Sequence, residues 1–170
     1  MGKRTDMSRK GKSAENAAGT PESYEKGDGW LDDYLPYQLY RATNRLNVRL
    51  QGRLRTIGIN LSQWRVLSVL RSYGTLTIGR IVEATLMEQP TVSRVVVQLE
   101  QEGMVSRRVS EEDSRMVDIT ITAKGAEAFD SIRSSAYRHE KLALEGLDQK
   151  QLDALRETLL HIERNIDLYE

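Results

Sequence analysis

The stretch from residue 89 to residue 122 restricts the fold of this chain more than any other part of the sequence. Pro90 suits the first turn of a helix, because a backbone N–H at that position has no partner within the helix to lose. The apolar residues that follow recur at spacings of three and four and form one helical face: Val92, Val95, Val96 and Leu99. Gly103 is typical of a helix C-terminal stop. The pattern therefore predicts a short helix with one buried face.

The opposite face of this helix is mostly polar. Its residues are Thr91, Ser93, Arg94, Val97, Gln98 and Gln101. An α-helix fits the major groove of B-DNA, where arginine pairs with guanine, glutamine pairs with adenine, and serine or threonine contacts phosphates or base edges. An ordinary surface helix packed on a core has the same kind of face. The helix alone therefore leaves both interpretations open.

Two short strands are predicted directly after this helix. Apolar and polar residues alternate partly over residues 104–109 and strictly over residues 117–121. The polar residues between them suit a hairpin tip. Near the tip, Arg115 is placed to reach a phosphate or a narrow minor groove, and Asp113 to hold that arginine through a charge-assisted bond. The alternative is a plain hairpin with an exposed salt bridge, which contributes little to stability.

These residues together resemble the winged helix-turn-helix of the MarR family of bacterial transcription regulators. Within residues 61–125 the resemblance rests on the segments LSQWRVLSVL, TIGRIVEAT, PTVSRVVVQLEQEGMVSRR, EDSR and DITITAKG. The Asp113-x-Arg115 pair of the wing and the Ile-Thr-x-x-Gly motif at the end of the second strand are, in combination, specific for this family. Helical flanks extend the resemblance to roughly residues 30–168. The sequence departs from the family at Pro90, where a small or polar residue is commoner, and at the acidic pair Glu111-Glu112 beside the wing tip.

The resemblance implies a mainly α fold with a small β-wing, in which residues 30–170 form a single MarR-like domain. The winged helix-turn-helix lobe is expected at residues 60–122, and dimerisation helices at residues 30–58 and 123–170. The chain is then a DNA-binding regulator, and most members of the family are repressors. The expected DNA-binding residues are Thr77, Gln89, Pro90, Thr91, Ser93, Arg94, Gln98, Arg107, Asp113 and Arg115.

Residues 1–29 are expected to form a disordered basic tail, because they are rich in Gly, Ser, Lys and Glu and poor in large apolar side chains. Such a tail either contacts DNA phosphates or stays solvated. The whole chain has 25 basic and 25 acidic residues, so its total charge does not favour a DNA binder. The placement of charge matters more than the total. The chain has no cysteine, which excludes a disulfide framework and a thiol-based oxidant sensor.

Residues 31–57 are predicted to form one long helix that ends at Gly58, with arginines at every fourth position beside its leucine ridge: Arg41, Arg45, Arg49 and Arg53. Like charges at this spacing repel slightly, so an acidic helix, a DNA phosphate or an anionic ligand is a conceivable partner, and a solvated face is the alternative. Further helices are predicted from Leu61 to Arg71 and from Thr77.

The last two helices are predicted from about Ala123 to Glu145 and after Asp148, which forms a capping box with Gln151. The final helix has apolar residues at heptad spacing, and such a seam at the end of a chain needs a cover, which is either the chain's own first helix or, as we predict, a second subunit. In the resembling family the terminal helices form a homodimer, which places two recognition helices roughly 34–36 Å apart on a palindromic site. The expected dimerisation residues are Leu35, Leu39, Leu152, Leu155, Leu159, Ile162 and Ile166.

An enzyme is not expected. The chain has two histidines, on separate predicted helices, and neither a phosphate-binding glycine-rich loop nor a nucleophile elbow. His139 with Glu140 and His161 with Glu163 offer too few convergent ligands for a metal. We therefore predict no cofactor and no metal. The sequence also has no membrane-spanning apolar run and no signal-peptide core, which indicates a cytoplasmic protein without a membrane partner.

The resembling family is often released from DNA by small aromatic or phenolic acids, or by their acyl-CoA thioesters. Residues on the elements that line the family's pocket are Tyr37, Tyr40, Arg41, Trp64 and Arg65. An aromatic wall with an arginine suits an aromatic carboxylate, although Trp64 is equally well explained as core. The alternative function is a winged-helix module that binds a protein partner without specific DNA binding.

Overall fold

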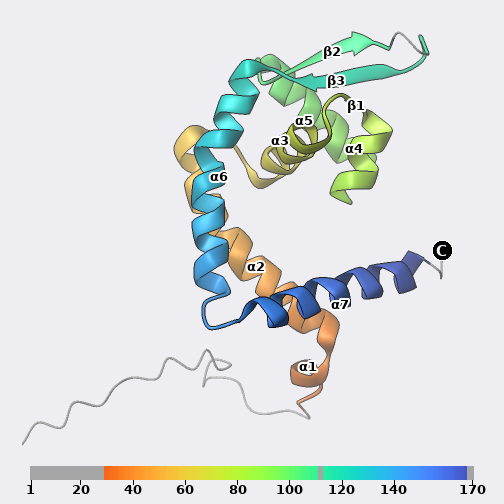
Figure 1. Cartoon of the computed structure of the whole chain (residues 1–170). Coiled ribbons are helices and arrows are strands. Elements are labelled where there is room, and N and C mark those ends of the chain that lie inside the picture. The colour runs from red at the N-terminus through yellow and green to blue at the C-terminus, as the bar shows by residue number, and fades with distance from the viewer. Residues whose placement is uncertain (1–28, 111–112, 168–170) are drawn as a thin grey trace, which may run out of the picture. The chain divides into compact units, whose positions relative to one another are not determined.

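The computed structural model describes residues 29–110 and 113–167 (Figure 1). Most of the predicted tail, the pair Glu111-Glu112 and the last residues of the chain therefore lie outside the described residues. The chain divides into two compact units, Met1–Gln38 and Leu39–Glu170. The division falls within a helix. In its described part the protein is mainly helical with one small antiparallel sheet, which confirms the predicted fold class.

The first predicted helix is interrupted. Helix α1 spans Trp30–Asp33, and helix α2 spans Leu35–Leu54. Tyr34 between them has an extended backbone, with φ −82° and ψ 99°. A continuous helix would bring the ring of Pro36 against the carbonyl of Asp32, four residues earlier, so the chain leaves the helix and restarts it. That carbonyl instead accepts a hydrogen bond from the Gln38 side chain. The prediction of one unbroken helix was wrong here because it gave Pro36 no weight.

The C-terminal end of α2 matches the prediction. The helix tightens into a 3-10 turn, η1 (Arg55–Ile57), and stops at Gly58, whose φ of 75° suits glycine. Helix α3 (Leu61–Tyr73) then begins with a reciprocal capping box, in which the Asn60 side chain and the Gln63 backbone N–H are 2.9 Å apart.

The core of the second unit lies among α3, α4 (Ile78–Thr85) and α5 (Gln89–Gln101), and it reaches the sheet at Ile119. Its fully buried side chains are Leu54, Val66, Leu67, Leu70, Ile81, Val92, Val96, Leu99, Ile119 and Ile132. Burial of this many aliphatic side chains is the main stabilising term of the unit. The apolar face predicted for residues 92–99 belongs to this core, so the outward face of α5 is fixed by packing.

The sheet contains three strands in the order β1-β3-β2. These are β1 (Leu76–Thr77), β2 (Val105–Val109) and β3 (Val117–Ile121). The hairpin of β2 and β3 was predicted, with Val109 opposite Val117 next to the tip. Strand β1 was not predicted, because two residues show no periodicity. Its Leu76 pairs with Ile119, which joins the wing to the start of the helix-turn-helix.

Helix α6 (Ala123–Ala143) starts at Thr122, whose hydroxyl accepts the backbone N–H of Gly125 at 3.2 Å. It packs on α3 through the stacked rings of Trp64 and Phe129, whose centroids lie 4.6 Å apart. Helix α7 (Gln149–Asp167) begins with the predicted capping box of Asp148 and Gln151. In the described part of the chain, no helix is long and apolar enough to cross a membrane.

Candidate nucleic-acid interface

Helices α4 and α5 are joined by a tight turn and form the predicted helix-turn-helix. Thr77 caps α4, with its hydroxyl 3.4 Å from the backbone N–H of Arg80. The turn begins at Leu86, whose backbone is left-handed with φ 53° and ψ 31°. Helix α5 follows Glu88 and has Pro90 in its first turn. Two of the predicted DNA-binding residues, Gln89 and Pro90, therefore lie exposed at the N-terminus of α5.

The outward face of α5 carries the side chains that the sequence assigns to DNA. Arg94 and Gln98 are exposed, whereas Thr91 and Ser93 are half-buried. The Arg94 guanidinium lies back along its own helix, with Nε 3.4 Å from the Pro90 carbonyl oxygen and Nη2 3.5 Å from Thr91 Oγ1. Both contacts are long and local, so they do not compete strongly with a base edge or a phosphate. The face is therefore available for DNA.

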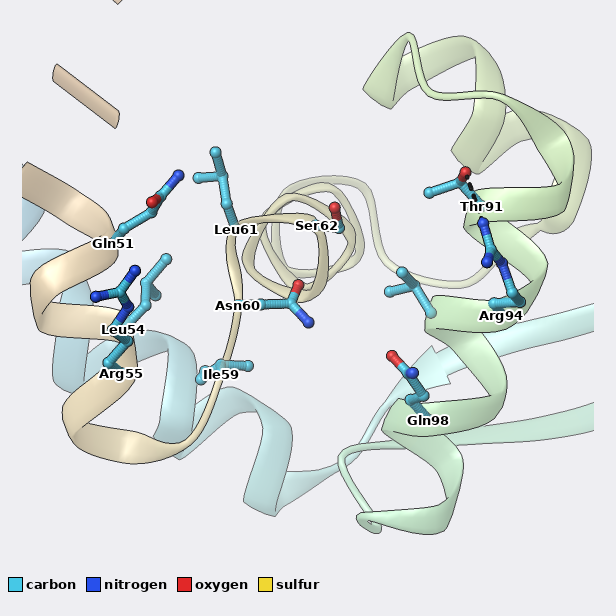
Figure 2. A pocket seen from close by; sticks show the side chains of 11 residues that line it. Gln51, Leu54, Arg55, Ile59, Asn60, Leu61, Ser62, Thr91, Arg94 and Gln98 are labelled. Carbon is cyan, nitrogen blue, oxygen red and sulfur yellow. Dashed lines mark hydrogen bonds between the residues drawn. The ribbon is translucent and has the colours of Figure 1, made fainter. Parts of the chain in front are cut away.

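A groove runs beside this face. Figure 2 shows Thr91, Arg94 and Gln98 of α5 on one side and residues from the junction of α2 and α3 on the other. The cavity between them has a volume of about 540 Å³. Its opposite wall includes Gln51, Arg55, Asn60 and Ser62. The sequence predicts Asn60 or Ser62 as a helix cap but does not predict this wall, because no periodicity connects the end of one helix with the face of another.

Arg107 lies on β2 but points to the recognition helix. Its Nε donates a hydrogen bond of 2.7 Å to Glu100 Oε2, and its Nη2 lies 2.5 Å from the same oxygen. This hydrogen bond raises the pKa of the Arg107 guanidinium. The sequence predicts Arg107 as a DNA contact. In the structure the Arg107 guanidinium is already paired with the Glu100 carboxylate of the same chain.

The wing tip differs from the prediction in one detail. The Asp113 carboxylate accepts the backbone N–H of Arg115 at 2.9 Å, as in an Asx turn. Asp113 thus shapes the turn and does not hold the Arg115 side chain through an ion pair. Within the described part of the wing, the Arg115 guanidinium has no salt bridge. Arg115 is exposed, as a wing-tip contact to DNA requires.

Comparison with known proteins agrees with this geometry. The family model described as MarR family matches residues 57–116, which cover the helix-turn-helix and the first wing strand. A MarR family transcriptional regulator from Silicibacter pomeroyi DSS has a crystal structure that is 31% identical to this chain, with a TM-score of 0.74. The alignment covers 82% of this chain and 93% of that protein. The chain belongs to the MarR family.

Two further relatives of this MarR-family chain are informative. The HTH-type transcriptional repressor IacR of Pseudomonas putida is 24% identical over 136 residues, which is 80% of this chain and 81% of the repressor. BpsR of Bordetella bronchiseptica, whose DNA binding is regulated by 6-hydroxynicotinic acid, shares the fold with a TM-score of 0.68 and 23% identity. That alignment covers 76% of this chain and 98% of BpsR. As a member of a family of transcriptional regulators, the chain is a regulator and not an enzyme.

The residues predicted to bind an effector lie in different environments. Trp64 is only 9% exposed and stacks on Phe129, whereas the neighbouring Arg65 is exposed. Tyr40 is exposed and Arg41 half-buried on α2, and Tyr37 lies in the N-terminal unit. Trp64 also lines a cavity of about 320 Å³ between α3 and α6. The other side chains of its wall are Ser68, Phe129, Arg133, Ala136, Tyr137 and Glu140. The sequence analysis missed this α6 wall, because it treated α6 as a dimerisation helix.

The predicted dimerisation residues of α7 are not covered by the chain's own core. Leu155, Leu159 and Ile166 are 43%, 37% and 57% exposed, and Leu152 and Ile162 are half-buried. Leu35 is 50% exposed and Leu39 half-buried. Among the described residues, no group of three His, Cys, Asp or Glu side chains gathers as a metal site would require.

Proposed function

We propose that this MarR-family chain is a sequence-specific repressor that binds a palindromic operator as a homodimer and is released by a small aromatic acid or its acyl-CoA thioester. The observation that carries the proposal is the exposed face of α5, with Arg94 and Gln98 outward and four apolar side chains anchored in the core. A rigidly held helix with such a face suits readout of base edges in the major groove. The similarity to the repressor IacR supports repression as the mode of action.

Base readout is assigned to α5, through Arg94 and Gln98 with Ser93 and Thr91, and Gln89 and Pro90 lie at its entry. Phosphate contacts are assigned to Thr77 and to the wing, where Arg115 reaches the minor groove. Asp113 contributes by holding the turn that presents Arg115. Arg107 pairs with Glu100 and contributes indirectly, and it contacts DNA only if DNA binding displaces Glu100.

A gel-shift series tests the function. The purified protein is titrated against fragments upstream of its own and neighbouring genes at two salt concentrations. A shift that resists competitor DNA and weakens with salt is expected, because phosphate contacts release counterions while base contacts set sequence preference. If no fragment shifts even at low salt, the proposal fails, and binding of a protein partner by the winged helix becomes the better account.

Two substitutions separate base contacts from phosphate contacts. Arg94→Ala should lower affinity for the operator and relax sequence preference, because a bidentate arginine–guanine contact discriminates by roughly 1–3 kcal/mol. Arg115→Ala should weaken binding to all sequences and make the salt dependence shallower. Wild-type binding by both variants would contradict these assignments.

The effector is proposed to bind in the cavity beside Trp64. Its volume suits a small aromatic ligand, and it has aromatic walls. Its charged side chains are Glu140 and Arg133, and Arg133 Nη1 lies 3.6 Å from Asp130 Oδ1, so a carboxylate ligand would have to share this arginine with Asp130. BpsR shows that this fold accommodates control by an aromatic acid, 6-hydroxynicotinic acid. A ligand that prefers the conformation unsuited to DNA lowers DNA affinity by the same factor by which DNA lowers ligand affinity.

Calorimetric titration with a panel of aromatic acids, with and without operator DNA, measures this coupling. Arg133→Gln should weaken ligand binding if the cavity is the site. Arg65→Gln on the exposed side of α3 is the comparison, because Arg65 is one of the effector-binding residues predicted from the sequence. Tight binding of an acid with no effect on DNA affinity would refute the release mechanism.

A further inference from the structure

The groove beside the recognition helix is lined by positive but not by negative side chains. Arg94 lies on the α5 wall, and Arg55 lies on the opposite wall at η1 (Figure 2). The remaining polar lining comes from uncharged side chains, and none of the residues that line the groove is acidic. Over the described residues, neither arginine forms a salt bridge. Two cations without a counter-charge make the groove attractive to an anion.

Arg55 is also held in place by its neighbours. Leu54, the residue before it, is completely buried, and the Leu54 carbonyl accepts the backbone N–H of Ile59 at 3.1 Å. Gly58 then closes the turn, with its N–H 3.2 Å from the Arg55 carbonyl. The backbone of Arg55 is therefore fixed to the same core that holds α5. A side chain on such a rigid element can define a binding geometry, whereas one on a loose loop cannot.

The position of the groove indicates which anion fits it. A helix that enters the major groove is flanked by the two sugar-phosphate backbones that border that groove, and phosphates receive half or more of the hydrogen bonds in protein–DNA complexes. The cavity of about 540 Å³ runs along three α5 residues that the proposed function assigns to DNA, namely Thr91, Arg94 and Gln98. A backbone strand that borders the major groove would pass on this side of α5.

We infer that this groove is a clamp for one DNA sugar-phosphate strand, in which Arg55 binds a phosphodiester from the wall opposite the recognition helix. Gln51 and Ser62 on the same wall supply neutral hydrogen-bond donors to the same strand. The clamp sets how deeply and in which register α5 enters the major groove, while base choice stays with α5. The inference rests on the proposed DNA-binding function and adds a phosphate contact from outside the helix-turn-helix and the wing.

The test compares Arg55→Gln with Arg45→Gln. Arg45 is an exposed arginine on α2 that does not line this groove, so it controls for the loss of one positive charge. Affinity for the operator and for a scrambled duplex is measured at several salt concentrations. Arg55→Gln should weaken both complexes by a similar factor, on the order of three- to tenfold, and should lower the salt slope by about one. Arg45→Gln should match the wild type.

Methylphosphonate substitution locates the contact on DNA. Single neutral phosphates are introduced along each half-site, and the loss of affinity is measured for the wild type and for Arg55→Gln. One position beside the recognition helix should weaken the wild type and leave Arg55→Gln unaffected, because the variant has already lost the charge that the phosphate pairs with. Circular dichroism checks that the variant is folded.

The outcomes distinguish this inference from the proposed function. If the wild type binds an operator specifically and Arg55→Gln keeps its affinity and salt slope, the clamp is wrong and the regulator assignment stands. If the wild type binds no DNA specifically, both fail. Inorganic phosphate is titrated into the protein as a separate arm. Saturable phosphate binding that needs Arg55, together with unchanged DNA affinity in Arg55→Gln, would assign the groove to a small anion and overturn the clamp.

Discussion

At the scale of single residues, Gly125 lies where the junction of the wing and helix α6 leaves no room for a side chain. It is buried at the start of α6, and a Cβ added to it would overlap the carbonyl oxygen of Met104 and lie 2.9 Å from Ile121 Cγ1. That carbonyl accepts the Thr122 N–H at 3.0 Å, so it cannot turn away without loss of a hydrogen bond. Gly125→Ala should therefore destabilise the protein by roughly 1–3 kcal/mol, despite the better helix propensity of alanine.

Thermal or urea unfolding measures this effect, and Gly52→Ala is the matched control. Gly52 lies within α2, where an added Cβ meets nothing within 4 Å. That substitution should be neutral or stabilising by up to about 1 kcal/mol. Equal stability of Gly125→Ala and the wild type would show that the junction shifts more easily than its contacts indicate.

Leu86 is the reverse case, a bulky residue at a position that suits glycine. Its φ is 53° and its side chain is 92% exposed, so it carries backbone strain without packing in return. Leu86→Gly should stabilise the protein by roughly 0.5–1 kcal/mol, because relief of the strain exceeds the extra entropy of glycine in the unfolded chain. Leu86→Ala keeps the strain and should give no gain. The free energy of unfolding in urea is measured for both variants. If Leu86→Ala is stabilised as much as Leu86→Gly, the cause is the exposed side chain and not the backbone strain.

At the scale of elements, the contact between Arg107 and Glu100 joins strand β2 to helix α5. The hydrogen bond to Glu100 raises the pKa of Arg107, so the arginine stays charged at every accessible pH. We predict that the pair positions the wing relative to the recognition helix. Arg107→Gln and Glu100→Gln should then weaken operator binding by similar factors, and the double variant should be no worse than either single variant.

A DNA contact by Arg107 predicts a different result. In that case Glu100→Gln would strengthen binding, because the arginine would be released toward the phosphates and a negative charge removed. Arg107→Gln alone would also lower the salt slope by about one. Affinity measured at several salt concentrations for the three variants separates the two roles.

The same elements show how far sequence reasoning reached. Strong local signals predicted the recognition helix, its glycine stop, the hairpin and the capping box of Asp148 and Gln151, because spacing and capping act over a few residues. Strand β1 was missed because its pairing of Leu76 with Ile119 is long-range and its two residues carry no pattern. The assignment of Asp113 as an ion-pair partner for Arg115 was wrong because sequence proximity does not distinguish a backbone N–H from a guanidinium. The groove wall at Arg55 could not be predicted, because it forms only when η1 packs beside α5.

At the scale of the whole molecule, the balanced charge of 25 basic and 25 acidic residues conceals a segregated distribution. Helix α2 has four arginines and no acidic residue. Total charge is therefore a poor guide to function in this chain, and the placement of arginines on α2, at η1 and at the wing tip is the informative quantity. The arginine row of α2 and the wing-tip arginine are visible in the sequence, whereas the position of Arg55 opposite α5 is visible only in the fold.

The apolar seam of α7 is a whole-molecule feature that the described residues of one chain leave largely uncovered. Leu155, Leu159 and Ile166 are spaced for helix–helix packing, yet they remain partly or largely exposed. A second copy that covers the seam by two-fold symmetry would also duplicate α5, and two linked recognition helices bind a palindrome far more tightly than one binds a half-site. Leu155→Glu should therefore produce monomers at micromolar concentration in light scattering. Its affinity for the palindrome should fall by about a hundredfold or more, while its affinity for an isolated half-site should be unchanged.

Leu160→Glu is the matched control for this prediction. Leu160 lies on the same helix and is 55% exposed, but its position falls outside the heptad seam. The control should remain dimeric and bind the palindrome normally, because a charge off the seam meets solvent. If Leu160→Glu separates the subunits as completely as Leu155→Glu, the interface does not follow the seam. If Leu155→Glu stays dimeric, another surface holds the two copies together, and the spacing of the half-sites must be set by that surface instead.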